Sequence, residues 1–272
     1  MKHAISLGAG VQSSAMALMA AHGEITPMPD AAIFADTHWE PDAVYGWLDE
    51  LEKILPFPVI RVQYRDGLKK AQWSSELEVR GRVSDGKMRL EIPVHTMSPR
   101  GVKGIMQQRI CTVDYKLKPV NTALKRLFGH KKGARLPKEP AITSWVGIST
   151  DEAHRMKPAR EPWQVKRFPL IEMNLSRGHC LQWMEKHDYP TPPRSSCVVC
   201  PFHSDAEWQS LSDKEFDEAC QFDEFIRGRD SMDSKLYLHA SCVPLREADI
   251  STPESAGQLN MFGNECFGMC GV

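Results

Sequence analysis

Eight cysteines make metal binding the first chemistry to consider, and two of them, Cys197 and Cys200, form a Cys-x-x-Cys pair. Such a pair presents two thiolates to one metal, and Pro201 directly after it matches the Cys-Pro ending of iron–sulfur motifs. His203 would instead complete a Cys-x-x-Cys-x-x-His zinc site, and free redox-active thiols are the third alternative. We interpret the pair as part of an iron–sulfur cluster.

A cluster with four thiolate ligands needs two further cysteines. Cys111 comes just before an expected helix, whose N-terminal dipole favours the thiolate; the alternative is a buried cysteine at a helix start. Near the end of the sequence, Cys266 and Cys270 both have neighbouring glycines, which permit tight wrapping around a metal. We therefore assign Cys111, Cys197, Cys200 and Cys270 as metal ligands, with Cys266 as the exchangeable choice for the fourth.

A second candidate for chemistry is the glycine- and serine-rich segment 8–14, which follows the short apolar strand expected over 4–7. Small residues let a backbone approach an anion closely, and the next helix points unpaired N–H groups and its positive dipole end at that anion. Ser13 and Ser14 add hydroxyl donors. The segment contains neither the Gly-Lys-Ser/Thr of a Walker loop nor a complete Gly-x-Gly-x-x-Gly. It predicts a phosphate-binding loop, with an ordinary strand–helix turn as the alternative.

These residues need a scaffold, and the hydrophobic pattern predicts alternating strands and helices. Apolar runs predict strands over 3–8, 31–35, 59–62 and 141–148. Helical spacing predicts helices over 12–22, 42–54, 67–75, 114–128, 151–156, 177–187 and 213–227. An insertion or short hairpin is expected over 80–104. The β-α-β-α-β order at the start indicates a doubly wound parallel sheet, and Cys180 and Cys220, on apolar helix faces, are expected in the core.

Polar residues at the ends of two expected strands extend the candidate site. Asp36 and Thr37 follow the second strand, and Asp151, Glu152 and Arg155 follow the strand that ends near residue 148. Parallel strands bring their carboxyl ends to one edge, where open α/β sheets bind ligands. Both groups also fit helix starts, where Asp and Thr act as caps and acids favour the first turn. Both interpretations stay open at this point.

The order of these motifs resembles one known family. Residues 8–13 are similar to the Ser-Gly-Gly-x-Asp-Ser loop of the PP-loop ATP pyrophosphatases (adenine nucleotide α-hydrolases). Residues 36–41 resemble the Asp-Thr-Gly-x-x-x-Pro-Glu element of the PAPS reductase-like branch of that superfamily. Residues 111–119 resemble its Cys-Cys-x-x-x-Lys-x-x-Pro string, and residues 147–155 resemble its Gly-Ile-x-x-Asp-Glu-x-x-Arg segment.

The chain departs from the family pattern at four places. Gly8 replaces the first serine of the loop, and Gln12 replaces the acid that helps to manage the metal–pyrophosphate. His38 stands where the branch usually has glycine, and Cys111 is one cysteine where the branch has two. An amide at position 12 still forms hydrogen bonds but does not neutralise a cation.

The resemblance implies an α/β fold with a mostly parallel five-stranded sheet, helices on both faces, and a C-terminal cysteine-containing extension. It also implies an iron–sulfur enzyme that uses Mg²⁺ and cleaves ATP, or a related adenine nucleotide, between the α and β phosphates to adenylate a substrate. Nucleotide contacts are then expected from Ser6, Gly8, Gly10, Gln12, Ser13, Ser14, Asp36, Thr37, Asp151 and Arg155. Catalytic roles are expected for Asp36, Lys116 and Cys266, the last because its Glu-Cys-x-Gly context resembles the tail that carries the nucleophile of sulfonucleotide reductases.

Three functional hypotheses follow from this reading. A [4Fe–4S] cluster in such a fold suggests sulfur transfer, so the first is an ATP-dependent thiolation-type enzyme acting on a nucleobase, a tRNA or a DNA. The second is a reductase of APS or PAPS, against which stand the single Cys111 and the loop with Gln12. The third is a zinc-stabilised nucleotide-binding protein without redox chemistry. The sequence does not identify a sulfur donor.

Composition limits the setting of this chemistry. The 272 residues carry 34 Lys and Arg against 35 Asp and Glu, so nucleic-acid binding needs a local patch. The basic stretch 125–138 is such a patch, and a solvated loop is its other interpretation. No apolar run approaches the ~18 residues of a membrane span, and no signal peptide precedes the first strand. We expect a cytoplasmic protein that does not bind membranes, with a homodimer as one assembly, a nucleotide-binding α/β domain over 1–175 and a helical, cysteine-rich region over 176–272 that closes the site.

Overall fold

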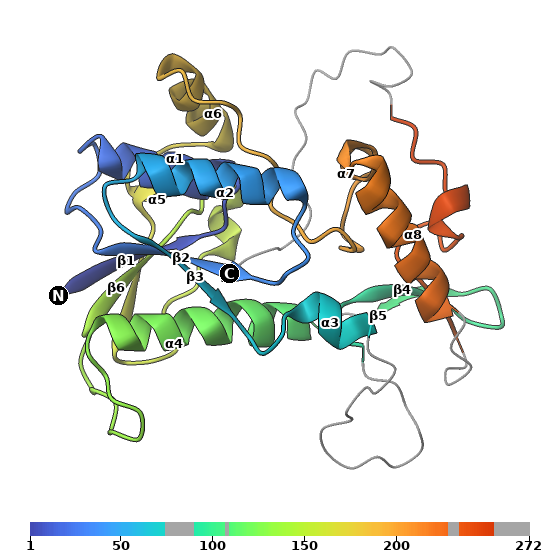
Figure 1. The fold of residues 1–272 in the computed structure, drawn as a ribbon, viewed down its shortest axis with the longest axis horizontal. Helices are drawn as coiled ribbons and strands as arrows, with labels where there is room; N and C mark the ends of the chain where they lie inside the picture. The colour runs from blue at the N-terminus through green and yellow to red at the C-terminus, as the bar shows by residue number, and fades with distance from the viewer. Residues whose placement is uncertain (74–89, 107–108, 228–233, 253–272) are drawn as a thin grey trace. The chain divides into compact units, whose positions relative to one another are not determined.

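The computed structural model describes residues 1–73, 90–106, 109–227 and 234–252 (Figure 1). The chain divides into two units. The first unit combines Met1–Arg65 with Asp114–Ser195, and the second combines the described parts of Asp66–Val113 and of residues 196–252. A segment of the second unit therefore interrupts the first unit in the sequence. The expected nucleotide-binding domain over 1–175, with a helical, cysteine-rich region over 176–272 that closes the site, stays a prediction.

A five-stranded sheet forms the centre of the first unit. Its strands are β1 (Lys2–Leu7), β2 (Ala31–Asp36), β3 (Val59–Gln63), β6 (Ile142–Val146) and β7 (Gln164–Arg167). They lie in the order β3-β2-β1-β6-β7, and every neighbouring pair is parallel. The register pairs Leu7 with Phe34 and Ser6 with Val146, so the carboxyl ends of β1, β2 and β6 meet at one edge.

Helices cover both faces of this sheet because its central strands are apolar on both sides (Figure 1). The helices of one face are α1 (Val11–Ala21), α2 (Asp42–Ile54), α5 (Pro169–Glu172) and α6 (Arg177–Lys186), and α4 (Lys118–Leu127) covers the other. Ile5 and Phe34 belong to the core under α1 and α2, whereas their neighbours Ala4 and Ile33 belong to the core under α4. Consecutive strand residues thus point to opposite faces. The predicted doubly wound α/β fold is confirmed.

Most predicted elements of the first unit lie within two residues of their expected bounds. The helix expected over 114–128 begins earlier, as a π-helix over Cys111–Leu117 that continues into α4. A short 3₁₀-helix over Thr150–Arg155 takes the place of the helix expected over 151–156. The sequence does not predict β7, because Gln164–Arg167 has a single apolar residue and pairs only with β6 at the edge of the sheet.

The second unit contains a three-stranded antiparallel sheet in the order β5-β4-β8. Its elements are α3 (Leu68–Trp73), β4 (Val94–Met97), β5 (Lys103–Met106), α7 (Asp205–Ser210), α8 (Asp213–Arg227), β8 (Lys235–Tyr237) and a 3₁₀-helix over Leu245–Glu247. The hairpin of β4 and β5 confirms the hairpin expected in the described part of 80–104. Among the residues described, none of the helices has both the length and the apolar character to cross a bilayer.

A buried aspartate organises the second unit. Asp223 of α8 is fully buried and accepts hydrogen bonds from the backbone N–H of Leu238 at 2.8 Å and of Leu245 at 3.0 Å. It also pairs with Arg227 one turn later. The Asp223 carboxylate therefore connects α8 to two positions in the chain after β8, Leu238 and Leu245.

Two cysteines were predicted to lie in the core, Cys180 of the first unit and Cys220 of the second. Both predictions are confirmed, since the two residues are 0% and 1% exposed.

Candidate nucleotide site

The loop between β1 and α1 lies at the switch point of the sheet. β1 is the central strand: the chain continues to β2 and β3 on one side of it and, later, to β6 and β7 on the other. Open α/β sheets bind ligands beyond the carboxyl ends of their strands at such a point, where the connections diverge. Residues 8–10 of the predicted phosphate-binding segment 8–14 form this loop, and the rest of the segment begins α1. The segment therefore lies where open α/β sheets bind ligands.

Gly8 and Gly10 of this loop are not required by packing or by backbone conformation. A Cβ at Gly8 would meet the Ser13 Oγ at 3.7 Å, and a Cβ at Gly10 would meet the Ser195 Cβ at 3.6 Å, both ordinary contacts. Gly10 has φ −90° and ψ 178°, values open to any residue. Neither a clash nor the backbone conformation therefore explains the two glycines, whereas the close approach of a phosphate to a backbone favours residues without a side chain.

Between these glycines, Ala9 is fully buried and has φ +56°, in the left-handed region. That conformation costs a residue with a Cβ roughly 1–2 kcal/mol. Gly10 then begins α1 without a side-chain cap, and the first turn of α1 carries no acidic residue. The positive end of the helix dipole is therefore not balanced by a charge of its own helix. A strained turn that leads into an uncapped helix start is suited to hold an anion.

The two serines after the loop point in different directions. The Ser13 hydroxyl turns back into the loop, where it donates to the Gly10 carbonyl and accepts from the Gly8 N–H, both at 3.2 Å. The Ser14 hydroxyl is buried and accepts the indole N–H of Trp47 in α2 at 2.9 Å. Ser13 is therefore the hydroxyl beside the loop. The nucleotide contact expected of Ser14 stays a prediction, and its hydrogen bond to Trp47 gives it a structural role.

The end of β6 packs directly on the start of α1 at Gly147. A Cβ at this position would lie 2.9 Å from both N and Cα of Ser13 and 3.2 Å from the carbonyl carbon of Gln12, all of them backbone atoms. The Ile148 N–H bonds back to the Val146 carbonyl at 2.9 Å, which makes a tight turn at the glycine. Gly147, within the predicted motif of residues 147–155, therefore sets the spacing of the two loops at the switch point.

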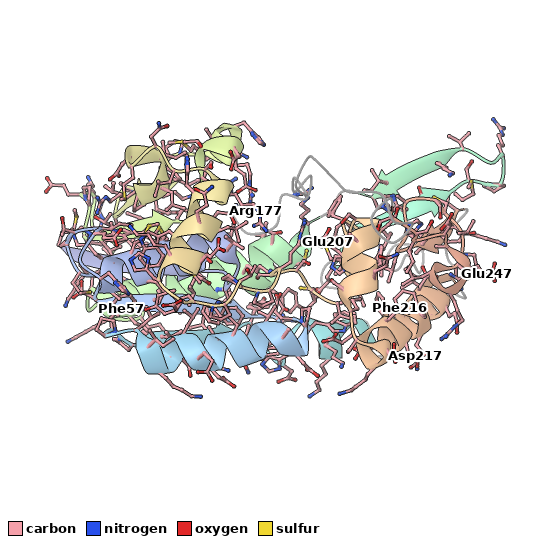
Figure 2. All side chains as sticks on the ribbon, turned by 90° about the horizontal axis from the view of Figure 1, so that it is seen from above. Phe57, Arg177, Glu207, Phe216, Asp217 and Glu247 are labelled. Atoms are coloured by element: carbon pink, nitrogen blue, oxygen red, sulfur yellow. The ribbon has the colours of Figure 1, made fainter. Side chains whose placement is uncertain are left out.

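Gln12 is held between a cation and an acid. Its Oε1 accepts from Nη1 of Arg177 at 3.3 Å, and its Nε2 donates to Oε2 of Glu152 at 3.5 Å. Glu152 also pairs with Arg155 at 2.6 Å. Arg177 is the first residue of α6 (Figure 2) and is a residue that sequence reasoning misses, because one arginine at a helix start carries no signal. A carboxylate at position 12 would neutralise Arg177, whereas the amide leaves more positive charge beside the loop.

Asp151 fits the capping interpretation of its motif. Its Oδ2 accepts from the backbone N–H of Arg177 at 2.5 Å and from the Ser149 hydroxyl at 3.3 Å. These bonds fasten the start of α6 to the turn after β6. Ser6 lies in β1 between Ile33 of β2 and Val146 of β6, two residues before the loop. The nucleotide contacts expected of Asp151 and Ser6 stay predictions.

Asp36 ends β2 at the same edge of the sheet. Its Oδ1 accepts from the Tyr45 hydroxyl at 2.8 Å and from the His38 N–H at 2.7 Å. Burial and the Asp36 carboxylate raise the pKa of Tyr45, so the phenol remains a proton donor at neutral pH. His38 has φ +59°, a conformation that glycine adopts without strain. The carboxylate is thus held in one orientation at the strand end.

Thr37 and Lys116 meet at a buried glutamate. Thr37 is fully buried, donates to Oε1 of Glu40 at 3.2 Å and accepts the N–H of Trp39 at 3.3 Å. The Lys116 ammonium lies 3.2 Å from the same Glu40 oxygen, and the Glu40 side chain is 1% exposed. The chain after β2 and the π-helix are therefore linked through Glu40. This link orients Lys116, while the nucleotide contact expected of Thr37 stays a prediction.

The Cys-x-x-Cys pair belongs to the second unit. Cys197 and Cys200 lie in one turn, closed by a hydrogen bond from the Cys200 N–H to the Cys197 carbonyl at 2.9 Å, and both are partly exposed. His203, the alternative zinc ligand, has its Nε2 2.9 Å from the Ser196 hydroxyl, and its ring packs on Trp208. A turn with two part-exposed cysteines fits a thiolate-bound metal or cluster.

Cys111 lies in the same unit and begins the π-helix. Its N–H bonds to the carbonyl of Glu91 at 2.7 Å. Arg109, two residues earlier, lies over the ring of Phe202 at 4.6 Å, and Phe202 follows the Cys-x-x-Cys pair by two residues. The two cysteine-bearing segments therefore pack against each other. Cys266 and Cys270, expected as nucleophile and fourth ligand, lie outside the described residues.

The basic stretch 125–138 connects α4 to β6. Such a connection reaches the amino ends of the strands, at the edge of the sheet opposite the candidate site (Figure 1). Its cations Lys131, Lys132, Arg135 and Lys138 are exposed. Lys125, still in α4, lies over the Trp163 ring at 5.4 Å. This arrangement favours the solvated-loop interpretation over contact with a substrate held at the phosphate-binding loop.

Comparisons with known proteins complete the description. Neither a scan against protein-family models nor a search of curated proteins found a match for this chain. Among solved structures, the chain is similar to a phosphoadenylyl-sulfate (PAPS) reductase from Candida auris in its phosphate complex. The superposition has a TM-score of 0.47 at 10% sequence identity and covers 78% of this chain and 84% of that chain.

Proposed function

We propose that this protein is an ATP-dependent enzyme of the PP-loop type, which binds an adenine nucleotide at the β1–α1 loop and cleaves it between the α and β phosphates. The observation that carries the proposal is the loop itself. Gly8 and Gly10 are required neither by a clash nor by a positive φ, and they lead into an uncapped helix start at the switch point of the sheet. The motif order of the sequence supports adenylation rather than transfer of the γ-phosphate.

Several residues of the site have specific roles in this proposal. The backbone N–H groups at the start of α1 bind phosphate oxygens, and the Ser13 hydroxyl joins them when it gives up its bond to the Gly10 carbonyl. Arg177 adds a positive charge that the amide of Gln12 does not neutralise. The Asp36 carboxylate, held by Tyr45, is suited to bind the ribose hydroxyls or Mg²⁺. A bound Mg²⁺ would neutralise negative charge on the phosphates. Lys116, oriented by Glu40, stabilises the charge that develops on the leaving pyrophosphate.

We further propose that the reaction is sulfur transfer to a nucleobase or nucleic acid, a tRNA or a DNA. Cys111, Cys197 and Cys200 fit a [4Fe–4S] cluster because they are part-exposed and their segments pack together. Cys270 or Cys266 would provide the fourth thiolate, and the other would act as nucleophile. The cluster, when bound, supplies a site that holds or activates sulfur.

The products of ATP turnover test the first proposal. The protein, purified without oxygen, is incubated with ATP, Mg²⁺ and total tRNA or DNA, and the nucleotides are separated by chromatography. AMP and pyrophosphate are expected; ADP and phosphate would overturn the assignment. Gly10→Val puts a branched side chain into the space for the phosphate and should abolish ATP binding in calorimetry. Gly46→Ala, on the exposed side of α2, is the control and should bind ATP as the wild type does.

Metal content tests the cluster. Wild-type protein should contain iron and sulfide and show broad visible absorption, and Cys197→Ser should contain neither. Cys242→Ser is the matched control, because Cys242 also lies in the second unit, outside the proposed ligand set, where its Sγ donates to the Thr96 carbonyl at 3.6 Å. Zinc in place of iron would support a structural metal site and reject the redox cluster. Iron that survives Cys197→Ser would reject this cysteine as a ligand.

A further inference from the structure

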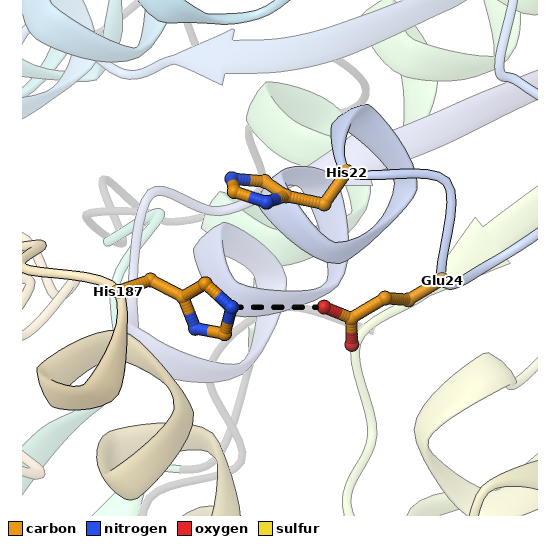
Figure 3. Close-up of side chains that lie close together, drawn as sticks. All are labelled: His22, Glu24 and His187. Atoms are coloured by element: carbon orange, nitrogen blue, oxygen red, sulfur yellow. Dashed lines mark ion pairs between the residues drawn. The ribbon is translucent and has the colours of Figure 1, made fainter.

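Two histidines and a glutamate converge at the far end of α1 from the phosphate-binding loop (Figure 3). His22 is the residue after α1, Glu24 follows in the turn toward β2, and His187 is the residue after α6. One ligand atom from each lies within 4.8 Å of the other two, and His187 Nε2 is 3.8 Å from Glu24 Oε1. We propose that His22, Glu24 and His187 bind a divalent transition metal, of which Zn²⁺ is the best match.

The orientation of His187 supports metal binding. Its Nδ1 lies 2.8 Å from the carbonyl oxygen of Trp183, so Nδ1 carries the proton and donates it to this acceptor. In the neutral ring, which is the form that binds metals, the lone pair is then on Nε2, which faces Glu24. Metal-binding histidines are held in this way by a hydrogen bond from the second ring nitrogen to a carbonyl or carboxylate. Trp183 also stacks on the His187 ring with centroids 4.0 Å apart, which restricts its rotation.

Glu24 and His22 are held by neighbours of the same cluster. The indole N–H of Trp183 lies 3.0 and 2.9 Å from the two carboxylate oxygens of Glu24. His22 Nε2 lies 2.9 Å from the Tyr189 hydroxyl, and donation to that oxygen leaves the lone pair on Nδ1. The rings of His22 and Trp183 pack in a T-shaped arrangement with centroids 5.3 Å apart. All three candidate ligands therefore have second partners that fix their direction.

The donor set selects the class of metal. Two imidazole nitrogens and one carboxylate oxygen form the His₂Glu set that binds zinc with a fourth position open to water. Hard cations such as Mg²⁺ and Ca²⁺ prefer oxygen ligands. With Zn–N distances of ~2.0–2.1 Å, tetrahedral ligand atoms lie about 3.3 Å apart. His187 Nε2 and Glu24 Oε1, now 3.8 Å apart, therefore need only a small side-chain rotation to reach the separation of two zinc ligands.

The site is separate from the proposed nucleotide site. The 11 residues of α1 lie between them, a length of roughly 16 Å at 1.5 Å per residue. A metal here would join the ends of α1 and α6, both of which begin beside the phosphate-binding loop. Its expected effect is stabilisation of the first unit rather than chemistry on ATP. The inference therefore does not depend on the proposed function.

Titration with Co²⁺ tests the proposal in the full-length protein. Cobalt bound through thiolates gives an intense near-ultraviolet charge-transfer band, which an N₂O site lacks, so the spectrum separates this cluster from the cysteines. Wild-type protein should bind one equivalent of Co²⁺ that shows only weak visible bands. His187→Gln should lose this equivalent or bind it at least tenfold more weakly, since even second-shell partners account for 10–100-fold in affinity. His154→Gln, which removes an exposed histidine elsewhere in the first unit, is the matched control and should bind as wild type.

Thermal unfolding with Zn²⁺ separates binding from packing. Zn²⁺ should raise the Tm of the wild type, because a ligand that binds only the folded state stabilises it. Glu24→Gln keeps an oxygen for the Trp183 indole and should keep the metal-free Tm, yet lose part of the increase with Zn²⁺. In His22→Gln and His187→Gln, the increase in Tm with Zn²⁺ should be reduced in the same way. An unchanged Zn²⁺ effect in all three variants, together with unchanged Co²⁺ affinity, would overturn the proposal and leave an aromatic packing cluster.

Discussion

Gly147 offers a direct test of how the two loops at the switch point are held together. In Gly147→Ala the new Cβ would stand 2.9 Å from two backbone atoms of Ser13, where ordinary contacts begin at 3.4 Å. Neither side yields easily, because β6 is buried along its length and the first turns of α1 are packed in the core. The substitution should therefore push the start of α1, and the loop before it, away from the end of β6.

The size of the effect follows from these contacts. Overpacking of a well-packed core costs typically 1–3 kcal/mol, and a clash of backbone with backbone belongs at the upper end. Replacing glycine also restricts the unfolded chain, which offsets roughly 0.4–1 kcal/mol of this cost. We therefore expect the free energy of unfolding to fall by about 2 kcal/mol. Gly46→Ala is the matched control: Gly46 lies in the exposed face of α2 with no atom within 4 Å of its Cβ position. It should gain about 0.5–1 kcal/mol from helix propensity.

Urea unfolding followed by circular dichroism measures both variants, with the midpoint and slope giving the free energy. The two Gly→Ala variants should differ by about 3 kcal/mol with opposite signs relative to wild type. Calorimetry should show ATP affinity at least tenfold weaker in Gly147→Ala and unchanged in Gly46→Ala. A Gly147→Ala protein as stable as Gly46→Ala, or one with wild-type ATP affinity, would refute the reasoning.

Three further predictions concern single buried or strained groups. Asp223→Ala should lower the unfolding free energy by roughly 3–5 kcal/mol in urea, since Arg227 loses its buried partner; a loss below 1 kcal/mol, on the order of a surface ion pair, would contradict this. Burial raises the pKa of the Cys180 thiol from 9.0 to about 12. Above pH 9 the unfolded chain loses this proton while the folded protein keeps it, so the folded state loses stability as the pH rises from 9 toward 12. The decline in urea midpoint above pH 9 should accordingly be shallower in Cys180→Ala, and equal declines would count against the shift. His38→Gly should be more stable than His38→Ala by about 1 kcal/mol, because position 38 is left-handed; an alanine variant of equal stability would show that the turn is not strained.

The fold was largely predictable because buried parallel strands are apolar on both faces. The run Ala31–Ala35 reads as a strand without knowledge of its neighbours, and the structure places it in the sheet as β2. β7 has no such run, since Gln164–Arg167 is polar except for Val165. Its strand conformation depends on pairing with β6, a tertiary contact that local sequence does not encode. The same limit applies to the π-helix at Cys111, whose start is tied to Glu91 by a hydrogen bond.

The candidate site was predictable in position and less so in orientation. Loop 8–10 and Asp36 follow apolar strands, so their place at the carboxyl edge comes from the fold. The direction of each side chain depends on neighbours far away in sequence. Ser14 turns toward Trp47, and Thr37 turns toward Glu40, although both belong to motifs that suggest a ligand. Arg177 enters the site only because α6 begins beside Gln12.

The interruption of the first unit has a consequence for how the protein is made. β1 pairs with β2 on one side and with β6 on the other, and Lys2 of β1 pairs with Ile142 of β6. At roughly 5–20 residues per second, synthesis of the chain between β1 and β6 takes roughly 7–27 seconds, during which one side of β1 has no partner. Such an open strand edge pairs readily with other chains, so nascent chains should depend on chaperones during this interval. Gly147, which packs on the start of α1, also emerges only after β6, so the proposed nucleotide site would be completed late in synthesis rather than with the loop itself.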